Sequence, residues 1–156
     1  MTDTDYMRLA IEKARQGIAK GQTPFGACIA RDGRAIACAH NGVWSGMDIT
    51  AHAEIRAIRE ACRVLKTVDL SGCVLYSTCE PCPMCFSASH WARISKIVFG
   101  ARIADAQAAG FNELTIPVEV MKERGGSPVE LVSDFMREAN VELFALWAAR
   151  RGRRAY

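Results

Sequence analysis

Residues 73–100 read CVLYSTCEPCPMCFSASHWARISKIVFG, and this stretch decides the fold. Residues 73–77 at its start and 97–100 at its end are short apolar runs typical of buried strands. Between them, residues 82–91 are expected to form a helix, with Pro83 tolerated in its first turn. A strand, helix, strand unit favours parallel pairing, a right-handed connection and helices that cover the sheet. The sequence therefore predicts a layered α/β sheet at the core.

The chain before this stretch carries signals for one helix and one hairpin. Apolar residues recur at helical spacing after Asp3-Thr4-Asp5, any of which can cap a helix, and the pattern stops at Gly21. Residues 25–30 and 34–39 are apolar runs joined by Asp32-Gly33, a dipeptide typical of hairpin turns with positive φ. We expect a first helix followed by two antiparallel strands.

A second amphipathic helix is expected over residues 51–65, with Asp48 or Thr50 available to cap its start. His52 and Glu54 then lie in its first turn. This places a histidine and a carboxylate at a helix N-terminus, where they can face the start of the helix in the 73–100 stretch.

The chain beyond residue 100 has weaker signals. Residues 105–109 are expected to form a short helix, residues 110–126 a long connection with a functional role, and residues 129–132 an edge strand. Asn140 is expected to cap a last helix that runs through Arg150.

Length and composition predict one ordinary domain. A chain of 156 residues, taken as a single unit over 1–156, buries about 70% of its unfolded surface on folding and needs no disulfide or metal cross-links for stability. No apolar run approaches the ~20 residues of a membrane span, and residues 1–5 are polar rather than signal-like. Seven cysteines are an odd number scattered through apolar segments, which favours a reducing compartment over a disulfide framework. We expect a cytoplasmic protein.

The net charge of +3 comes from 20 basic and 17 acidic residues, and much of the excess lies in the C-terminal tail. A phosphate-binding face normally needs basic residues spread over a surface. We therefore expect a solvated tail rather than nucleic-acid binding by Arg150, Arg151, Arg153 and Arg154.

An HAE triplet at residues 52–54 and a PCPMC run at residues 81–85 together predict a metal site. Cysteine binds zinc as thiolate, and a helix N-terminus favours thiolate because it carries about half a positive charge. The two cysteines of the run share one helix face, and the histidine can approach from the facing helix. A catalytic zinc site has three protein ligands and keeps one position for a water whose pKa falls to ~7. Glu54 points elsewhere on its helix, so we expect it beside the metal and not bound to it.

Cys79 forms a second CxxC pair with Cys82, so a closed structural site of His52, Cys79, Cys82 and Cys85 is the alternative. That arrangement leaves Glu54 without a role, and Cys79 precedes the helix. We favour the open site, in which His52, Cys82 and Cys85 bind one zinc ion.

The H-x-E and P-C-x-x-C pattern resembles the signature of the cytidine deaminase-like superfamily of zinc nucleobase deaminases, and the resemblance covers nearly the whole chain. It implies a three-layer α/β/α sandwich with a mixed five-stranded sheet, one zinc ion per subunit, and Glu54 as proton shuttle. In that chemistry zinc-bound water gives its proton to Glu54, the hydroxide attacks the carbon that bears the exocyclic amine, and ammonia departs.

The chain also resembles the bacterial guanine deaminases within that superfamily. The resemblance implies deamination of guanine to xanthine, with Phe25 stacking on the base, Asn41 bonding it, and Glu113 recognising it and handling protons. Composition alone reads Phe25 as a core residue, Asn41 as a turn former and Glu113 as a solvated acid. The resemblance rests on residues 24–27, 50–54, 79–85, 91–93 and 109–111 and on the terminal Tyr156.

Further contacts follow from position and from the same resemblance. Trp44, in a loop bracketed by glycines, is expected at the pocket rim, and Ala53 is expected to contact the substrate. The resemblance makes Tyr156 part of a lid, because residues 138–156 form a C-terminal helix and tail that cross to a partner subunit. It also implies a homodimer that binds a small nucleobase. Trp91 is expected to pack in the interior.

The pattern departs from that family at Ile49, where a proline is usual, and at Asn112-Glu113, which replaces a pair of acids. The run over residues 91–101 also resembles the tRNA adenosine deaminases, which act on a flipped base. Deamination of cytosine or of an amino-triazine such as ammeline fits the same pocket. A non-enzymatic alternative is a zinc-stabilised binding module that uses the arginine tail and has no need of Glu54.

Overall fold

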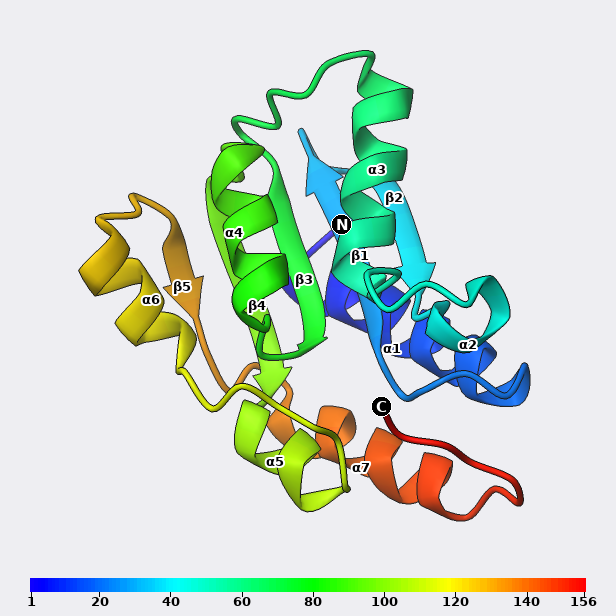
Figure 1. The fold of residues 1–156 in the computed structure, drawn as a ribbon. Coiled ribbons are helices and arrows are strands. Elements are labelled where there is room, and N and C mark those ends of the chain that lie inside the picture. The colour runs from blue at the N-terminus through cyan, green and yellow to red at the C-terminus, as the bar shows by residue number, and fades with distance from the viewer.

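The computed structural model describes residues 1–156, and a mixed five-stranded sheet forms its centre (Figure 1). The strand order is β2-β1-β3-β4-β5. The β1 strand pairs antiparallel with β2 and β3, whereas β4 runs parallel to both β3 and β5. The predicted strands are confirmed, with the bounds β1 Gly26–Arg31, β2 Arg34–His40, β3 Val74–Cys79, β4 Lys96–Ala101 and β5 Glu130–Val132.

Helices cover both faces of the sheet and make three layers (Figure 1). On one face α1 (Asp3–Ala19) and α7 (Arg137–Ala148) pack over residues such as Tyr76 and Val98. On the other face α3 (Ala53–Leu65) packs over Leu75 and Ile97, together with α4 (Pro83–Trp91). No helix combines the length and the apolarity needed to cross a membrane. The expected α/β/α sandwich is confirmed, and the remaining helices are α2 Val43–Gly46, α5 Ile103–Ala108 and α6 Val118–Gly125.

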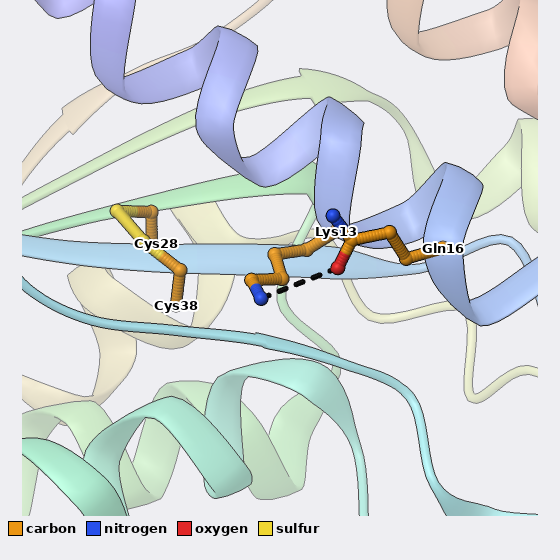
Figure 2. The surroundings of a disulfide bond; sticks show 4 residues. All are labelled: Lys13, Gln16, Cys28 and Cys38. Carbon is orange, nitrogen blue, oxygen red and sulfur yellow. Dashed lines mark hydrogen bonds between the residues drawn. A yellow bond between two sulfur atoms is a disulfide. The ribbon is translucent and has the colours of Figure 1, made fainter.

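The β1–β2 hairpin forms as predicted, because Asp32 and Gly33 both take positive φ, at 50° and 75°. One expectation about this hairpin was wrong: Cys28 and Cys38 form a disulfide (Figure 2). The two residues are partners in the ladder, with their Cα atoms 4.0 Å apart. The other five cysteines are free. A cytoplasmic location therefore stays a prediction.

Three other local expectations are corrected. The α1 helix is capped by Thr2, not by Asp3-Thr4-Asp5, because the Asp5 N–H donates to the Thr2 hydroxyl and the Thr2 N–H donates to the Asp5 carboxylate. The 110–126 connection contains a helix, α6, of which only Val118 is buried, so it carries little apolar periodicity to read.

The last helix begins at Arg137, so Asn140 lies inside it and does not cap it. The buried Asn140 amide donates to the carbonyl oxygens of Phe135 and Met136, at 3.1 and 3.0 Å. It occupies the space where a Cβ atom of Gly100 would lie. The asparagine therefore fastens the start of α7 against β4.

Gly26 lets α1 approach the sheet closely. A Cβ atom at this position would collide with the Ala10 carbonyl oxygen and would lie 2.7 Å from the Ala14 nitrogen. Both of these are backbone atoms of α1, so no side chain can move to make room. The close contact holds α1 against the first residue of β1, next to Phe25.

We predict that Gly26→Ala lowers the free energy of unfolding by about 1 to 3 kcal/mol, because the added methyl group must displace helix backbone. Urea unfolding monitored by circular dichroism measures the change. Gly125→Ala is the matched control, since nothing lies within 4 Å of a Cβ atom there. Equal midpoints for the two variants would contradict the close packing.

Candidate active site

His52 reaches the site because it is the N-cap residue of α3. The preceding loop is bent by Asp48, whose carboxylate accepts from the N–H and the hydroxyl of Thr50 at 2.8 and 2.6 Å. Neither Asp48 nor Thr50 caps α3 through its side chain, which corrects that expectation. The loop instead aims the imidazole toward the start of α4.

The start of α4 supplies two sulfur atoms. Cys82 is its N-cap residue and Pro83 follows as the first helical residue, so Cys85 lies one turn on, on the same side. The Nδ1 atom of His52 lies 3.6 Å from the Cys82 sulfur and 3.5 Å from the Cys85 sulfur. The ligand atoms of the three residues all lie within 4.8 Å of one another. The three residues predicted as ligands therefore meet.

The chemistry of this donor set fits a zinc ion. A hydrogen bond from Cys85 and the nearby His52 lower the pKa of the Cys82 thiol to about 4. Burial instead raises the pKa of Cys85, so the protein alone stabilises one thiolate and not two. A divalent cation is needed to hold both thiolates beside a neutral imidazole, and two sulfurs with one nitrogen is a donor set that zinc prefers.

Cys79 lies outside this group. Its sulfur points to the Arg102 carbonyl oxygen, 3.5 Å away, and burial keeps its pKa well above the usual thiol range. The side chain therefore stays a neutral thiol. The alternative of a closed site with three cysteines has no support in the geometry.

Glu54 stands beside the metal-binding residues and is only 6% exposed. Its Oε1 atom accepts a hydrogen bond of 3.2 Å from the Ser77 hydroxyl, at the centre of β3. Burial raises the pKa of this carboxyl. A carboxyl whose pKa is raised holds a proton more readily than an exposed one, which suits a group that takes up and releases a proton.

A small, partly open pocket adjoins these residues, with a cavity of about 20 Å³. That volume holds about one water molecule. Of the residues predicted to bind substrate, Phe25, Glu113 and Tyr156 line it. Asn41, Trp44 and Ala53 do not. Burial raises the pKa of Glu113, which therefore lies in the pocket wall and not in a solvated loop.

The other three predicted residues lie outside the pocket lining. Asn41 is fully buried, donates to the Tyr156 hydroxyl at 2.7 Å and accepts from the Val43 N–H at 3.0 Å. The Trp44 indole donates to the Arg154 carbonyl oxygen at 2.9 Å, so it contacts the C-terminal tail. Ala53 is the first residue of α3 and is buried in the core cluster between α3 and the sheet.

The C-terminal tail closes the pocket of its own chain (Figure 1, red). The Tyr156 ring lies 5.5 Å from the His52 ring, and the Tyr156 carbonyl oxygen accepts from the Asn112 N–H at 2.9 Å. The Arg154 guanidinium stacks 4.1 Å over Trp44. Tyr156 must move before any base can enter, because the remaining cavity is far smaller than a purine.

Glu80 is a pocket residue that we did not predict. Its Oε2 atom accepts from the Ile103 N–H at 2.9 Å and its Oε1 atom from the Val118 N–H at 2.8 Å. These amides begin α5 and α6, so one carboxylate caps two helices. The segment between the helices carries Glu113, and Glu80 anchors the start of α5 before it and the start of α6 after it. No local spacing could reveal this, because the partners are 23 and 38 residues away.

A mixed sheet with a histidine and two cysteines at facing helix starts, beside a buried glutamate, defines a zinc-dependent hydrolytic deaminase. Residues 1–101 match the family described as "Cytidine and deoxycytidylate deaminase zinc-binding region", and the chain belongs to that family.

Similar proteins include guanine deaminases and tRNA adenosine deaminases. A guanine deaminase of Bacillus subtilis is 43% identical over 123 residues, which cover 78% of this chain and 79% of that protein. A tRNA-specific adenosine deaminase of Bacillus subtilis is 39% identical over 136 residues, which cover 87% and 82%. The structure of a guanine deaminase from Nitrosomonas europaea superposes with a TM-score of 0.87 at 32% identity, covering 96% of this chain and 86% of that one.

We predict that Cys82→Ala removes nearly all bound zinc, whereas Cys79→Ala retains it, because only the first change removes a ligand. Metal analysis of the purified variants by mass spectrometry measures the difference. Folding is checked by circular dichroism. Loss of zinc from Cys79→Ala to the same extent would point to the closed site instead.

Proposed function

We propose that this deaminase converts free guanine and water to xanthine and ammonia. The observation that carries the proposal is the small size of the pocket beside His52, Cys82 and Cys85, together with its lining by Glu113 and Tyr156. Glu113 lines one side of the pocket, and Tyr156 covers it from the tail. A free base can be surrounded in this way, whereas a base joined to a ribose-phosphate chain needs an open side.

Guanine fits the pocket chemically. Its ring N–H and amino groups are hydrogen-bond donors, and Glu113 offers a carboxylate acceptor in a half-buried position. Phe25 offers a ring face or edge, held in place by Phe111 at 5.0 Å. Asn41 becomes available to the base when Tyr156 withdraws, since the Tyr156 hydroxyl now accepts its amide hydrogen. Ala53 packs in the core cluster next to His52, and Trp44 binds the tail that ends in Tyr156.

His52, Cys82 and Cys85 would hold the zinc ion. When bound, zinc supplies an acidified water as nucleophile at neutral pH. The Glu54 carboxylate takes up the proton of the nucleophile, and Ser77 keeps its Oε1 atom oriented during the transfer. Glu54 gives this proton to the ring nitrogen next to the attacked carbon, then takes the remaining proton of the added hydroxyl group and passes it to the departing amine. The carbon–nitrogen bond breaks as a carbonyl forms, so guanine and water yield xanthine and ammonia.

We predict that Glu54→Gln keeps its zinc and lowers turnover by ~10² to 10⁴-fold, because an amide cannot carry the proton. Ammonia release and zinc content are measured on the same preparation. Glu123→Gln, in an exposed position on α6, is the control and should retain wild-type turnover. Unchanged turnover in Glu54→Gln at full zinc content would rule out the shuttle, and with it the deaminase role of this pocket.

Substrate choice is tested by ammonia release from guanine, cytosine, ammeline, guanosine and a tRNA anticodon loop. We expect guanine to be the best substrate.

Glu113→Gln should lower kcat/KM for guanine about tenfold to a hundredfold, because a charged acceptor for the base is lost. Faster release from the anticodon loop would establish the second candidate, a tRNA adenosine deaminase, which the 39% identical relative favours.

We further propose that the chain forms a homodimer through the surface around Trp91. Trp91 is the last residue of α4 and is 78% exposed, which corrects its expected burial. It adjoins a hollow of about 640 Å³ that is also lined by Ile116 and Met121. An exposed apolar surface of this kind is typical of subunit interfaces. Exchange of residues 138–156 between the subunits remains a prediction.

We predict that sedimentation velocity finds a dimer for the wild type and a monomer for Trp91→Arg, because a charge replaces the apolar contact. Met47→Arg is the control, since Met47 is as exposed but lies away from the hollow. A monomeric wild type, or a dimer in both variants, would contradict this surface as the interface.

A further inference from the structure

A second hollow lies along the free edge of the sheet, between α1 and α3. It has a volume of about 490 Å³ and shares no lining residue with the pocket beside His52. Strand β2 forms its floor, and β2 is an edge strand. Five cationic side chains line it against one acid, Glu60. We call it the basic groove, and its cations are Lys13, Lys20, Arg56, Arg59 and Arg63.

The cations converge from two helices on opposite faces of the sheet. Lys13 and Lys20 are seven residues apart, which places them on one side of α1. Arg56, Arg59 and Arg63 follow the i, i+3, i+7 spacing on α3 and share one side of it. Figure 2 shows Lys13 reaching over the hairpin near Cys38, where it donates to Gln16 at 3.3 Å. The two basic helix sides therefore face one another across β2.

Most of this positive charge lacks a partner. Arg63 pairs with Glu60 at 2.6 Å, and Arg59 lies 3.8 Å from Asp48. Lys13, Lys20 and Arg56 take part in no ion pair. Like charges gathered in one hollow repel, so an anion bound there would stabilise the arrangement.

Two features of the groove floor support this conclusion. Burial lowers the pKa of His40, and Arg56, Lys20 and Lys13 lower it further, as expected in a positive field. Arg56 donates through Nη1 to the His40 carbonyl oxygen at 2.6 Å. That bond fixes the guanidinium plane and leaves its other N–H groups free to meet phosphate oxygens.

We propose that the basic groove binds a compact polyphosphate, such as the triphosphate of a nucleotide. Its volume lies in the range of small-molecule sites, about 300 to 1,000 Å³. An extended nucleic-acid surface spreads its basic residues along a face, whereas here the unpaired cations gather in one hollow. The site is separate from the deaminase pocket and does not depend on which base is deaminated.

Isothermal titration calorimetry of the zinc-loaded, full-length protein with inorganic triphosphate tests the site. We expect saturable binding of one triphosphate per chain. The double variant Lys13→Gln, Lys20→Gln should weaken it by about tenfold or more, because charge-assisted contacts to phosphate are lost. The matched control Arg150→Gln, Arg151→Gln removes the same charge from the exposed tail and should change the affinity by less than about twofold. Neither lysine lines the deaminase pocket, so the first pair should deaminate at the wild-type rate.

Further arms use GTP and a short single-stranded RNA, with zinc content measured after each titration. Tighter binding of GTP than of inorganic triphosphate identifies a nucleotide as the ligand, and equal binding identifies the polyphosphate alone. Both support the site. Absence of saturable binding, or equal weakening by the lysine and arginine pairs, overturns it. Tighter binding of RNA that depends on both pairs also overturns it, in favour of an extended nucleic-acid surface.

Discussion

Two helix N-termini that meet at one end of the sheet are the constraint on which the rest of this structure depends. His52 begins α3 and Cys82 begins α4, and their side chains meet Cys85 within 4.8 Å. The parallel pairing of β3 with β4 requires α4 to cross over the sheet, which places its start beside α3. The partial positive charge at both helix starts favours thiolates. A divalent cation then compensates the negative charge of the two cysteine thiolates, which the side chains alone do not.

Substrate access depends on segments far from the metal-binding residues. Phe25 precedes β1, Glu113 lies between α5 and α6, and Tyr156 ends the chain, yet all three line one pocket. Glu80 connects them to the metal site, because it follows β3 directly and caps both α5 and α6. The tail is held by hydrogen bonds, one cation–π contact and the aromatic contacts of Tyr156 with His52 and Phe111. A base can enter only when Tyr156 moves, so the C-terminal tail is the cover of the metal-binding residues.

Local chemistry made much of this predictable. Asp32-Gly33 specified the hairpin, the 73–100 stretch specified the parallel crossover, and the two short motifs brought the three metal-binding residues and Glu54 together. Each of these signals lies within a few residues of its effect. The resemblance added Phe25, Glu113 and Tyr156, which composition alone could not separate from core or loop residues.

The features that sequence reasoning missed depend on pairing between distant segments. The Cys28–Cys38 bond follows from the register of β1 and β2, which the apolar runs did not define. Asparagine is a typical capping residue, but Asn140 lies inside α7. Its amide donates to backbone carbonyl oxygens and packs against Gly100. The basic groove combines residues of α1 and α3 that only the folded sheet brings together. In each case the residue type indicated the chemistry of the side chain, but the sequence did not indicate which distant residue it contacts.

Zinc K-edge X-ray absorption on the metal-loaded protein tests the central claim most directly, because it counts the atoms bound to the ion. The account predicts two sulfur neighbours at about 2.3 Å with two nitrogen or oxygen neighbours at about 2.0 to 2.1 Å, one of them exchangeable with solvent. Three sulfur neighbours and one nitrogen, with no exchangeable position, would contradict it.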